Sequence, residues 1–238
     1  MDRSAIEKIV ELGAPNMVEE MGYTYSDKPL NVVEEPRVST LTFHTLGGLI
    51  AALKAEHGGF GGPILVDVKD EETVVVYTAF NSSDRKREIP YEARAELIGI
   101  PFDRKLDYET MMITLKSKFV QTPELLDLVK LLGTITEENS AMLSDDGFTQ
   151  TVVVRKGIAL KDNKVVDPIV RLRPYRTFNE VSEQPESEFL VRLSEGGYVA
   201  LYEADGGAWK LKARSLIARY LKNELSDLIS SGEVIVVE

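Results

Sequence analysis

The chain has 238 residues, of which 43% are hydrophobic and 28% are charged, so it has the composition of a globular protein with room for one large or two small domains. Its 39 acidic side chains outnumber its 28 basic ones, and the net charge of −11 disfavours general binding to nucleic acid or to an anionic membrane. The absence of cysteine excludes disulfides, thiol catalysis and cysteine-ligated metal sites.

No membrane or secretion signal is recognised in the sequence. No apolar stretch approaches the roughly 18 residues of a membrane-spanning helix. The first residues lack the charged region and apolar run of a signal peptide. We therefore expect a cytoplasmic protein without a membrane partner.

Residues 1–40 are predicted to form a short amphipathic helix followed by a long extended arm. Ser4 and Glu7 fit a capping box, apolar side chains recur on one helical face, and Gly13 fits the C-terminal stop. From 14 to 39 the chain carries three prolines and few periodic apolar positions. A connection of this length is often an arm that packs against something else, such as a neighbouring subunit; an unremarkable surface wrap is the alternative.

A helix and a β-hairpin are predicted next. A short strand precedes Thr45, which fits the N-cap of a helix that ends at Gly58. The β-branched runs at 64–68 and 73–80 flank a charged tetrapeptide and indicate a hairpin. A third strand, weakened by a proline, is expected within 87–97.

The middle of the chain is predicted to be helical. One helix starts near Asp107, and a second has Thr122 as N-cap, Pro123 at its first position and Gly133 at its end. The polar segment 135–147 is expected to connect this region to the strands that follow.

The C-terminal part is predicted to be rich in strands. Two strands, at 149–160 and 167–178, are joined through Lys-Asp-Asn-Lys. Three further strands form a meander that ends in the segment Ala-Trp-Lys-Leu-Lys-Ala (208–213), because Asp-Gly between apolar runs is a strong hairpin signal. Ser215 then caps a final helix, and 233–238 form a terminal edge strand.

Together these elements define an α+β protein in which antiparallel sheet dominates, with meander hairpins, several amphipathic helices and an extended N-terminal arm. The predicted organisation is a helix and arm at 1–40 and a single α+β domain at 41–238. The sequence shows no internal repeat and no low-complexity segment.

Four glycines within 58–62 raise the question of a phosphate-binding loop. Such loops follow a strand and precede a helix, whereas these glycines follow a helix and precede a strand. They are therefore predicted to stop the helix and turn the chain. His44 and His57 lie near opposite ends of that helix, so a shared metal ion is not expected.

An arginine-rich strand is the main candidate interaction feature. Arg171 and Arg173 are expected to project from one face of this strand. With Tyr175 and Arg176 they form a candidate contact surface for single-stranded nucleic acid or for a protein interface. These arginines can equally pair with the acidic residues of the Glu-Gln-Pro-Glu-Ser-Glu segment that ends at Glu188, which would neutralise them.

Carboxylates gather around two predicted turns of the meander, where an acidic patch could bind a cation or a basic partner. A solvated acidic surface is the simpler interpretation. The residues are Glu186, Glu188, Glu203 and Asp205.

The blocks RPYRTFNEVSEQPESEFLVRL (173–193) and ALYEADGGAW (200–209) resemble the YfdQ family of phage and prophage proteins. LTFHTLGGLI (41–50) and SDDGFTQTVVVRKGIAL (144–160) are similar to that family too. The resemblance implies a phage origin and residence in the cytoplasm of the host. It implies no activity that can be assigned to named residues, although such proteins are encoded near phage recombination and replication genes.

These observations predict a non-catalytic phage accessory protein that associates with itself, with no catalytic residue, cofactor or metal site. An accessory factor that binds single-stranded nucleic acid and an acidic inhibitor of a host protein remain as alternatives. An enzyme is the fourth hypothesis, which would require converging carboxylates or a histidine in a deep pocket.

Overall fold

The computed structural model describes residues 2–29, 37–81, 85–137, 141–145, 150–156, 159–166, 168–194 and 197–238, with side chains described outside 134–167. The chain divides into two compact units, Met1–Arg37 and Val38–Glu238. Helices alternate with sheets whose strands are mostly antiparallel. This confirms the predicted α+β class.

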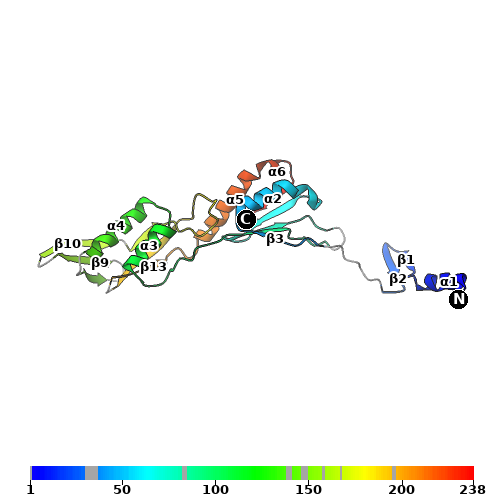
Figure 1. Cartoon of the computed structure of the whole chain (residues 1–238), viewed down its shortest axis with the longest axis horizontal. Coiled ribbons are helices and arrows are strands. Elements are labelled where there is room, and N and C mark those ends of the chain that lie inside the picture. Colours follow the sequence, from blue (N-terminus) through cyan, green and yellow to red (C-terminus); the bar gives the residue numbers. More distant parts are fainter. Residues whose placement is uncertain are drawn as a thin grey trace. The chain divides into compact units, whose positions relative to one another are not determined.

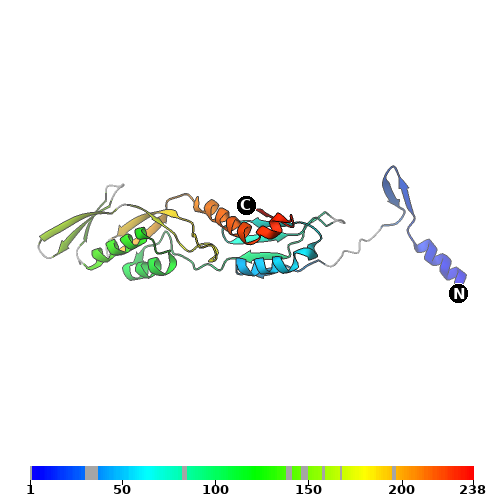
Figure 2. The same ribbon diagram turned by 90° about the horizontal axis from the view of Figure 1, so that it is seen from above.

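The N-terminal unit contains the helix α1 (Arg3–Gly13) and a β-hairpin of β1 (Met17–Glu20) and β2 (Tyr23–Ser26) (Figures 1 and 2). The sequence predicted only an extended arm where the hairpin lies. Its turn is formed by Met21 and Gly22, both with positive φ angles of 52° and 80°. Two consecutive residues with positive φ form the tight turn that joins hairpin strands. The sequence did not predict this turn, because asparagine, aspartate or glycine is usual at its first position and methionine is not.

The start of α1 also differs from the predicted capping box. Asp2 occupies the N-cap, without a side-chain hydrogen bond to the helix backbone. The hydroxyl of Ser4 instead donates to the Asp2 carboxylate at 2.9 Å. Ser4 is therefore a helical residue, and the capping-box prediction was wrong by two positions.

A five-stranded sheet forms one half of the larger unit. Its central strands β4 (Ile64–Val68), β5 (Thr73–Tyr77) and β6 (Tyr91–Arg94) are antiparallel, as the hairpin prediction required. The edge strands β14 (Val234–Val237) and β3 (Leu41–Phe43) join β4 and β6 in parallel. The C-terminal edge strand predicted from the sequence is thus present.

Three helices cover one face of this sheet, as Figure 1 shows: α2 (Leu46–Glu56), α5 (Trp209–Glu224) and α6 (Ser226–Ser230). The predicted N-cap of α2 is confirmed, because the Thr45 hydroxyl accepts a hydrogen bond from the Gly48 backbone N–H at 3.1 Å. The first hydrophobic core lies between the sheet and these helices. Its members include Leu46, Leu49, Leu53, Val66, Val76, Tyr91, Ile217 and Leu221.

A four-stranded sheet and two helices form a second core. The strand order is β11 (Ile169–Leu172), β12 (Ser187–Ser194), β13 (Tyr198–Glu203) and β7 (Leu106–Asp107). The helices α3 (Tyr108–Lys118) and α4 (Pro123–Glu137) pack on one face. The core members include Met111, Leu115, Phe119, Leu125, Leu132, Leu172, Phe189, Val191 and Leu201.

The chain between α4 and β11 forms a separate antiparallel sheet of β8 (Ala141–Asp145), β9 (Gln150–Lys156) and β10 (Ala159–Val166). Two predictions were wrong here. The helix α4 continues through Gly133, and the segment expected to be a connector contains β8. The Lys-Asp-Asn-Lys sequence lies inside β10 rather than in a loop.

The largest error of the sequence prediction lies at the end of the meander. Residues 208–213 were predicted to be a strand, but α5 begins at Trp209, and Ser215 lies inside it. Gly206 and Gly207 adopt positive φ angles of 62° and 82°, and the Asp205 carboxylate accepts the Gly207 N–H at 3.1 Å. This turn directs the chain from β13 into a helix instead of a hairpin.

Tyr91 gives the first core a measurable pH dependence. Burial raises its pKa to about 12 from an ordinary value of 10, assisted by a hydrogen bond to Glu56. The folded state keeps this proton where the unfolded chain loses it, so the contribution to stability is complete below pH 10 and is lost as the pH rises to about 12. Between pH 10 and about 12, we expect the free energy of unfolding of Tyr91→Phe to fall less steeply with pH than that of the wild type. Tyr198→Phe changes an exposed tyrosine, so it should keep the wild-type slope.

A decline that is identical in the wild type and in Tyr91→Phe would contradict this assignment. The Tyr198→Phe variant controls for the general titration of tyrosines and lysines in alkaline solution.

Candidate functional site

The glycine-rich segment lies on a short 3-10 helix, η1 (His57–Phe60), which continues directly from α2. Gly61 follows with a φ of 70°, so the segment ends one helix and turns the chain, as predicted. The Phe60 ring packs edge-on against Tyr91, with their centroids 5.7 Å apart. A shallow pocket of about 420 Å³ beside η1 is lined by Glu56, whose carboxylate opposes an anionic ligand.

The two histidines are held separately. His44 lies 3.4 Å from Glu96, and the ring of His57 contacts both the Leu53 carbonyl, at 3.2 Å, and Glu233, at 3.4 Å. Among the residues that the structure describes, no group of three or more histidine, aspartate and glutamate side chains is arranged to hold a metal ion.

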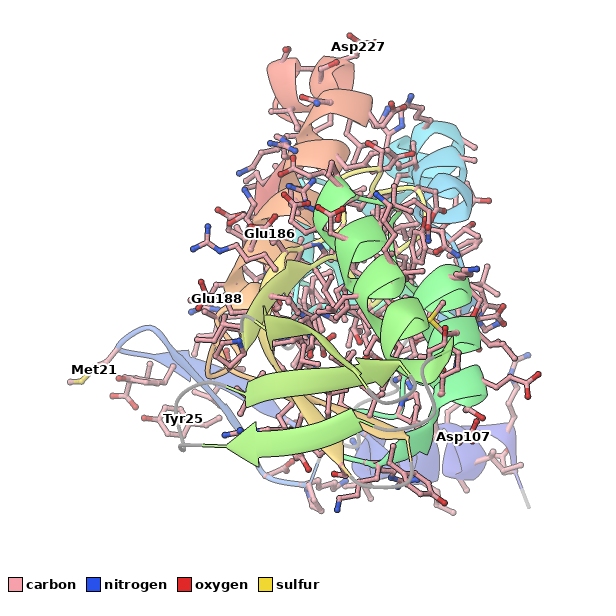
Figure 3. The ribbon with its side chains drawn as sticks, turned by 90° about the vertical axis from the view of Figure 1, so that its left-hand side faces the viewer. Met21, Tyr25, Asp107, Glu186, Glu188 and Asp227 are labelled. Atoms are coloured by element: carbon pink, nitrogen blue, oxygen red, sulfur yellow. The ribbon has the colours of Figure 1, made fainter. Side chains whose placement is uncertain are left out.

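Arg171 and Arg173 pair with carboxylates of the neighbouring strand and of the segment before it. The Arg171 guanidinium donates through Nε and Nη2 to Glu188 at 3.2 and 3.0 Å. Arg173 donates to Glu186 in the same way, at 3.2 and 3.1 Å. Figure 3 shows Glu186 and Glu188 projecting from the same side. These are the ion pairs that the sequence left open as an alternative to a free basic surface.

Tyr175 lies just beyond β11 and is partly exposed. Its backbone N–H donates to the Lys118 carbonyl at 3.0 Å, which ties the segment to the end of α3. The side chain is 39% exposed. Of the four candidate contact residues, Arg171, Arg173 and Tyr175 therefore face solvent.

Arg176, the fourth candidate, is buried, with 6% of its surface exposed. Its guanidinium lies over the Trp209 ring at 3.6 Å from the centroid and donates to Glu203 and Ser187. Burial lowers the pKa of Arg176 to about 10, against the opposing effect of Glu203 and Asp205, so the group stays charged at neutral pH. Arg176 is a structural cation rather than a contact residue.

This cluster lies where the two cores of the larger unit meet. Phe178 and Val181 belong to the first core, while Leu172 belongs to the second, so the segment between β11 and β12 crosses from one to the other. The Thr177 hydroxyl donates to the Glu71 carbonyl, in the turn between β4 and β5, at 2.7 Å. Sequence analysis did not foresee the role of Trp209, because it assigned that residue to a strand.

An open pocket of about 340 Å³ adjoins Arg171 and the start of α5. Its charged lining is mixed: Arg171 and Lys212 lie beside Glu186, Glu188 and Asp205. Asp205 already accepts the Gly207 N–H at the helix start and a hydrogen bond of 2.5 Å from Ser187. The pocket therefore offers no concentrated charge for a phosphate or a metal ion.

The face of the four-stranded sheet opposite α3 and α4 carries a row of apolar side chains across three strands. Ile169, Leu190 and Tyr202 lie opposite one another in the register of β11, β12 and β13. They alternate with the buried residues that face α3 and α4, and Ile169 is 47% exposed. Arg171 and Arg192 lie on the same face, on either side of the row.

The five-stranded sheet has a matching row on the face opposite its helices. Ile235, Leu65 and Tyr77 lie opposite one another across β14, β4 and β5. Ile235 is 51% exposed and, like Ile169, lies on an edge strand. Each sheet thus packs its helices on one face and presents an isoleucine, a leucine and a tyrosine on the other.

The N-terminal unit exposes nearly all of its apolar surface. Every residue from Asp2 to Pro29 except Lys28 is exposed. In α1, Ile6, Ile9 and Val10 form one stripe and are 49–68% exposed. The helix and the hairpin therefore have no shared hydrophobic core within the described residues of this unit.

One face of the hairpin is aromatic. Val18 lies opposite Tyr25, and Glu20 lies opposite Tyr23, so these four side chains share a face. Figure 3 shows Tyr25 projecting from the hairpin, and Met21 at its turn. Neither Glu19 nor Glu20 forms an ion pair with a described residue.

Comparison with known proteins adds no relative: no family model matches the chain, and neither a curated protein nor a solved structure matches it. The described helices include no continuous apolar run of the length that a bilayer span requires.

Proposed function

We propose that this chain is a non-catalytic phage accessory protein that acts in the host cytoplasm as a homo-oligomer, with the N-terminal unit as the element that binds another copy. One observation carries the proposal: the unit displays an apolar helix stripe and an aromatic hairpin face, both exposed. The resemblance of residues 173–193 and 200–209 to the YfdQ family supports the phage origin.

The size of the two elements supports docking. An isolated helix shorter than roughly 12–15 residues is only marginally stable in water, and α1 has 11 residues. A two-stranded hairpin alone is equally marginal. Burial of their apolar faces against a partner supplies the free energy that these elements lack within the unit.

The alternatives have less support. Arg171 and Arg173 are engaged with Glu188 and Glu186, and Arg176 is buried, so this strand offers little free positive charge for single-stranded nucleic acid. The exposed surface of the N-terminal unit is instead apolar and aromatic, which does not suit a nucleic-acid backbone. Inhibition of a host protein would use the same surface, and it would leave the purified chain monomeric.

Light scattering coupled to size-exclusion chromatography tests the proposal. We expect the full chain to have a mass of two or more copies, and Ile9→Glu to shift it towards the monomer, because a charge enters the apolar stripe. Lys8→Gln is the matched control, since it changes the net charge equally from the opposite side of α1. A monomeric wild-type chain at micromolar concentration would contradict the proposal.

A further inference from the structure

We infer that the helix α1 of one copy packs on the aromatic hairpin face of a second copy, and that the second α1 packs on the first hairpin in return. The two contacting surfaces are the apolar stripe of α1 and the face that Val18, Tyr23 and Tyr25 form. This inference rests on the proposed function and identifies which surface of the N-terminal unit binds which.

The junction between α1 and the hairpin keeps the two surfaces of one copy apart. The Lys28 ammonium donates to the carbonyl of Leu12 and, at 2.9 Å, to that of Ala14, at the C-terminal end of α1. Asp27 accepts the backbone N–H of Asn16 at 2.8 Å and its side-chain amide at 3.1 Å. Figure 2 shows the helix and the hairpin diverging from this junction. Because every side chain on both surfaces is exposed, a second chain can bind either of them.

The two surfaces match in size and spacing. The 11 residues of α1 span about 16 Å, and the four-residue strands of the hairpin span about 13 Å. One helix, about 10–12 Å across, covers a ribbon of two strands that lie about 5 Å apart. Ile6 and Val10 lie about 6 Å apart along the helix axis. Tyr23 and Tyr25 lie about 7 Å apart along their strand, so the branched side chains can pack between the rings.

Reciprocal contact supplies the area that a single contact lacks. Two tyrosines bury roughly 300–500 Å² at most, which is about half of the roughly 800 Å² per partner in a stable interface. In a reciprocal pair each copy buries its hairpin face and also its helix stripe. Two copies related by a two-fold axis therefore cover both apolar surfaces of each N-terminal unit.

Charge favours a contact of helix with hairpin over a contact of hairpin with hairpin. Glu20 lies on the aromatic face and forms no ion pair with a described residue. Two hairpin faces in contact would bring two Glu20 carboxylates into one small interface, where like charges repel. The helix instead carries Arg3 beside its stripe, three residues before Ile6.

The Arg3 side chain is available for this contact. It is 91% exposed in its pair with Glu7. Exposed ion pairs contribute little to stability, so the guanidinium can turn to Glu20 of the second copy at small cost.

A mixture of two variants tests the reciprocal contact. Ile9→Glu damages the helix stripe, and Tyr23→Ser combined with Tyr25→Ser damages the hairpin face. We expect each variant alone to weaken the dimer at least tenfold in apparent dissociation constant, because both contacts of the pair then contain a damaged surface. In an equimolar mixture, a mixed dimer joins the intact stripe of one chain to the intact hairpin of the other.

We therefore expect the mixture to form dimers, by light scattering, at a concentration at which each variant alone is monomeric. The second contact of the mixed dimer contains both damaged surfaces, and a contact already broken by one change loses little more from the other. Contacts of helix with helix and of hairpin with hairpin give the opposite result, since each contact of the mixed dimer would then contain a damaged surface. A mixture that associates no more tightly than its components would overturn the inference.

Met17→Ser is the control for the hairpin variant. Met17 is 53% exposed, close to the 56% of Tyr25, and it lies on the other face of the hairpin. We expect this variant to keep the wild-type dissociation constant; a loss equal to that of the tyrosine variant would count against the aromatic face. Circular dichroism should show all variants folded, because each substituted side chain is exposed and both hydrophobic cores lie in the larger unit.

The outcomes separate this inference from the proposed function. If Ile9→Glu dissociates the wild-type dimer and the mixture stays monomeric, the reciprocal contact is wrong and self-association through the N-terminal unit stands. A wild-type mass above two copies would also exclude the reciprocal pair but not self-association. If the wild-type chain is monomeric, both fail.

Discussion

Replacing Arg176 with methionine is expected to lower the free energy of unfolding by about 3 kcal/mol. The variant keeps an unbranched apolar stem but loses the guanidinium, with its charge and its donors. Glu203 and the buried Ser187 then lose the donor that holds them, and Trp209 loses the cation stacked on its ring. Urea denaturation of the full chain measures the change.

Two further variants determine the origin of this loss. Arg176→Lys should remain destabilised, because an ammonium cannot donate to Glu203 and Ser187 while stacking flat on Trp209. Combining Arg176→Met with Glu203→Gln should recover part of the stability, since no unpaired carboxylate remains. A single Arg176→Met variant as stable as the wild type would show that the cluster does not hold the two cores together.

Truncation of Phe189 to alanine is expected to lower the free energy of unfolding by about 4 kcal/mol. Phe189 is fully buried in the second core. Its ring stacks on Phe102 at a centroid distance of 5.1 Å and meets Phe119 edge-on at 6.3 Å. Alanine would leave a cavity beneath Arg176, whose guanidinium lies 5.7 Å from the Phe189 centroid.

Phe80→Ala is the comparison for this prediction, because Phe80 is 64% exposed and the Arg87 guanidinium lies over its ring, 4.1 Å from the centroid. We expect Phe80→Ala to lower the free energy of unfolding by less than about 1 kcal/mol. Thermal unfolding followed by circular dichroism measures the stability of both variants. Equal losses for Phe189→Ala and Phe80→Ala would contradict the assignment of Phe189 to a packed core.

Where a local pattern has a single physical solution, the sequence predicted the structure. The apolar spacing after Thr45 gives α2 its buried stripe, and the N-cap hydrogen bond forms as expected. The alternating β-branched residues of β4 and β5 pair as a hairpin. The glycines at 58–62 end a helix, since their order relative to helix and strand excludes a phosphate loop.

Local patterns failed where two structures share the same residues. Asp205, Gly206 and Gly207 fit a hairpin turn and also a strand-to-helix turn. The burial of Trp209, Ala213 and Leu216 on one side of α5 decides for the helix. The Met21-Gly22 turn lacked a recognisable signal, so the hairpin of the N-terminal unit was read as an arm.

The sequence by itself determined the α+β class, the N-cap of α2 and most strands, because these depend on periodicity and capping within a few residues. Only the tertiary structure decided what Arg171, Arg173 and Arg176 do, since their partners Glu188, Glu186 and Glu203 lie on other segments of the chain. It also decided which face of each sheet the helices cover, because strand order and helix placement arise from contacts between distant residues.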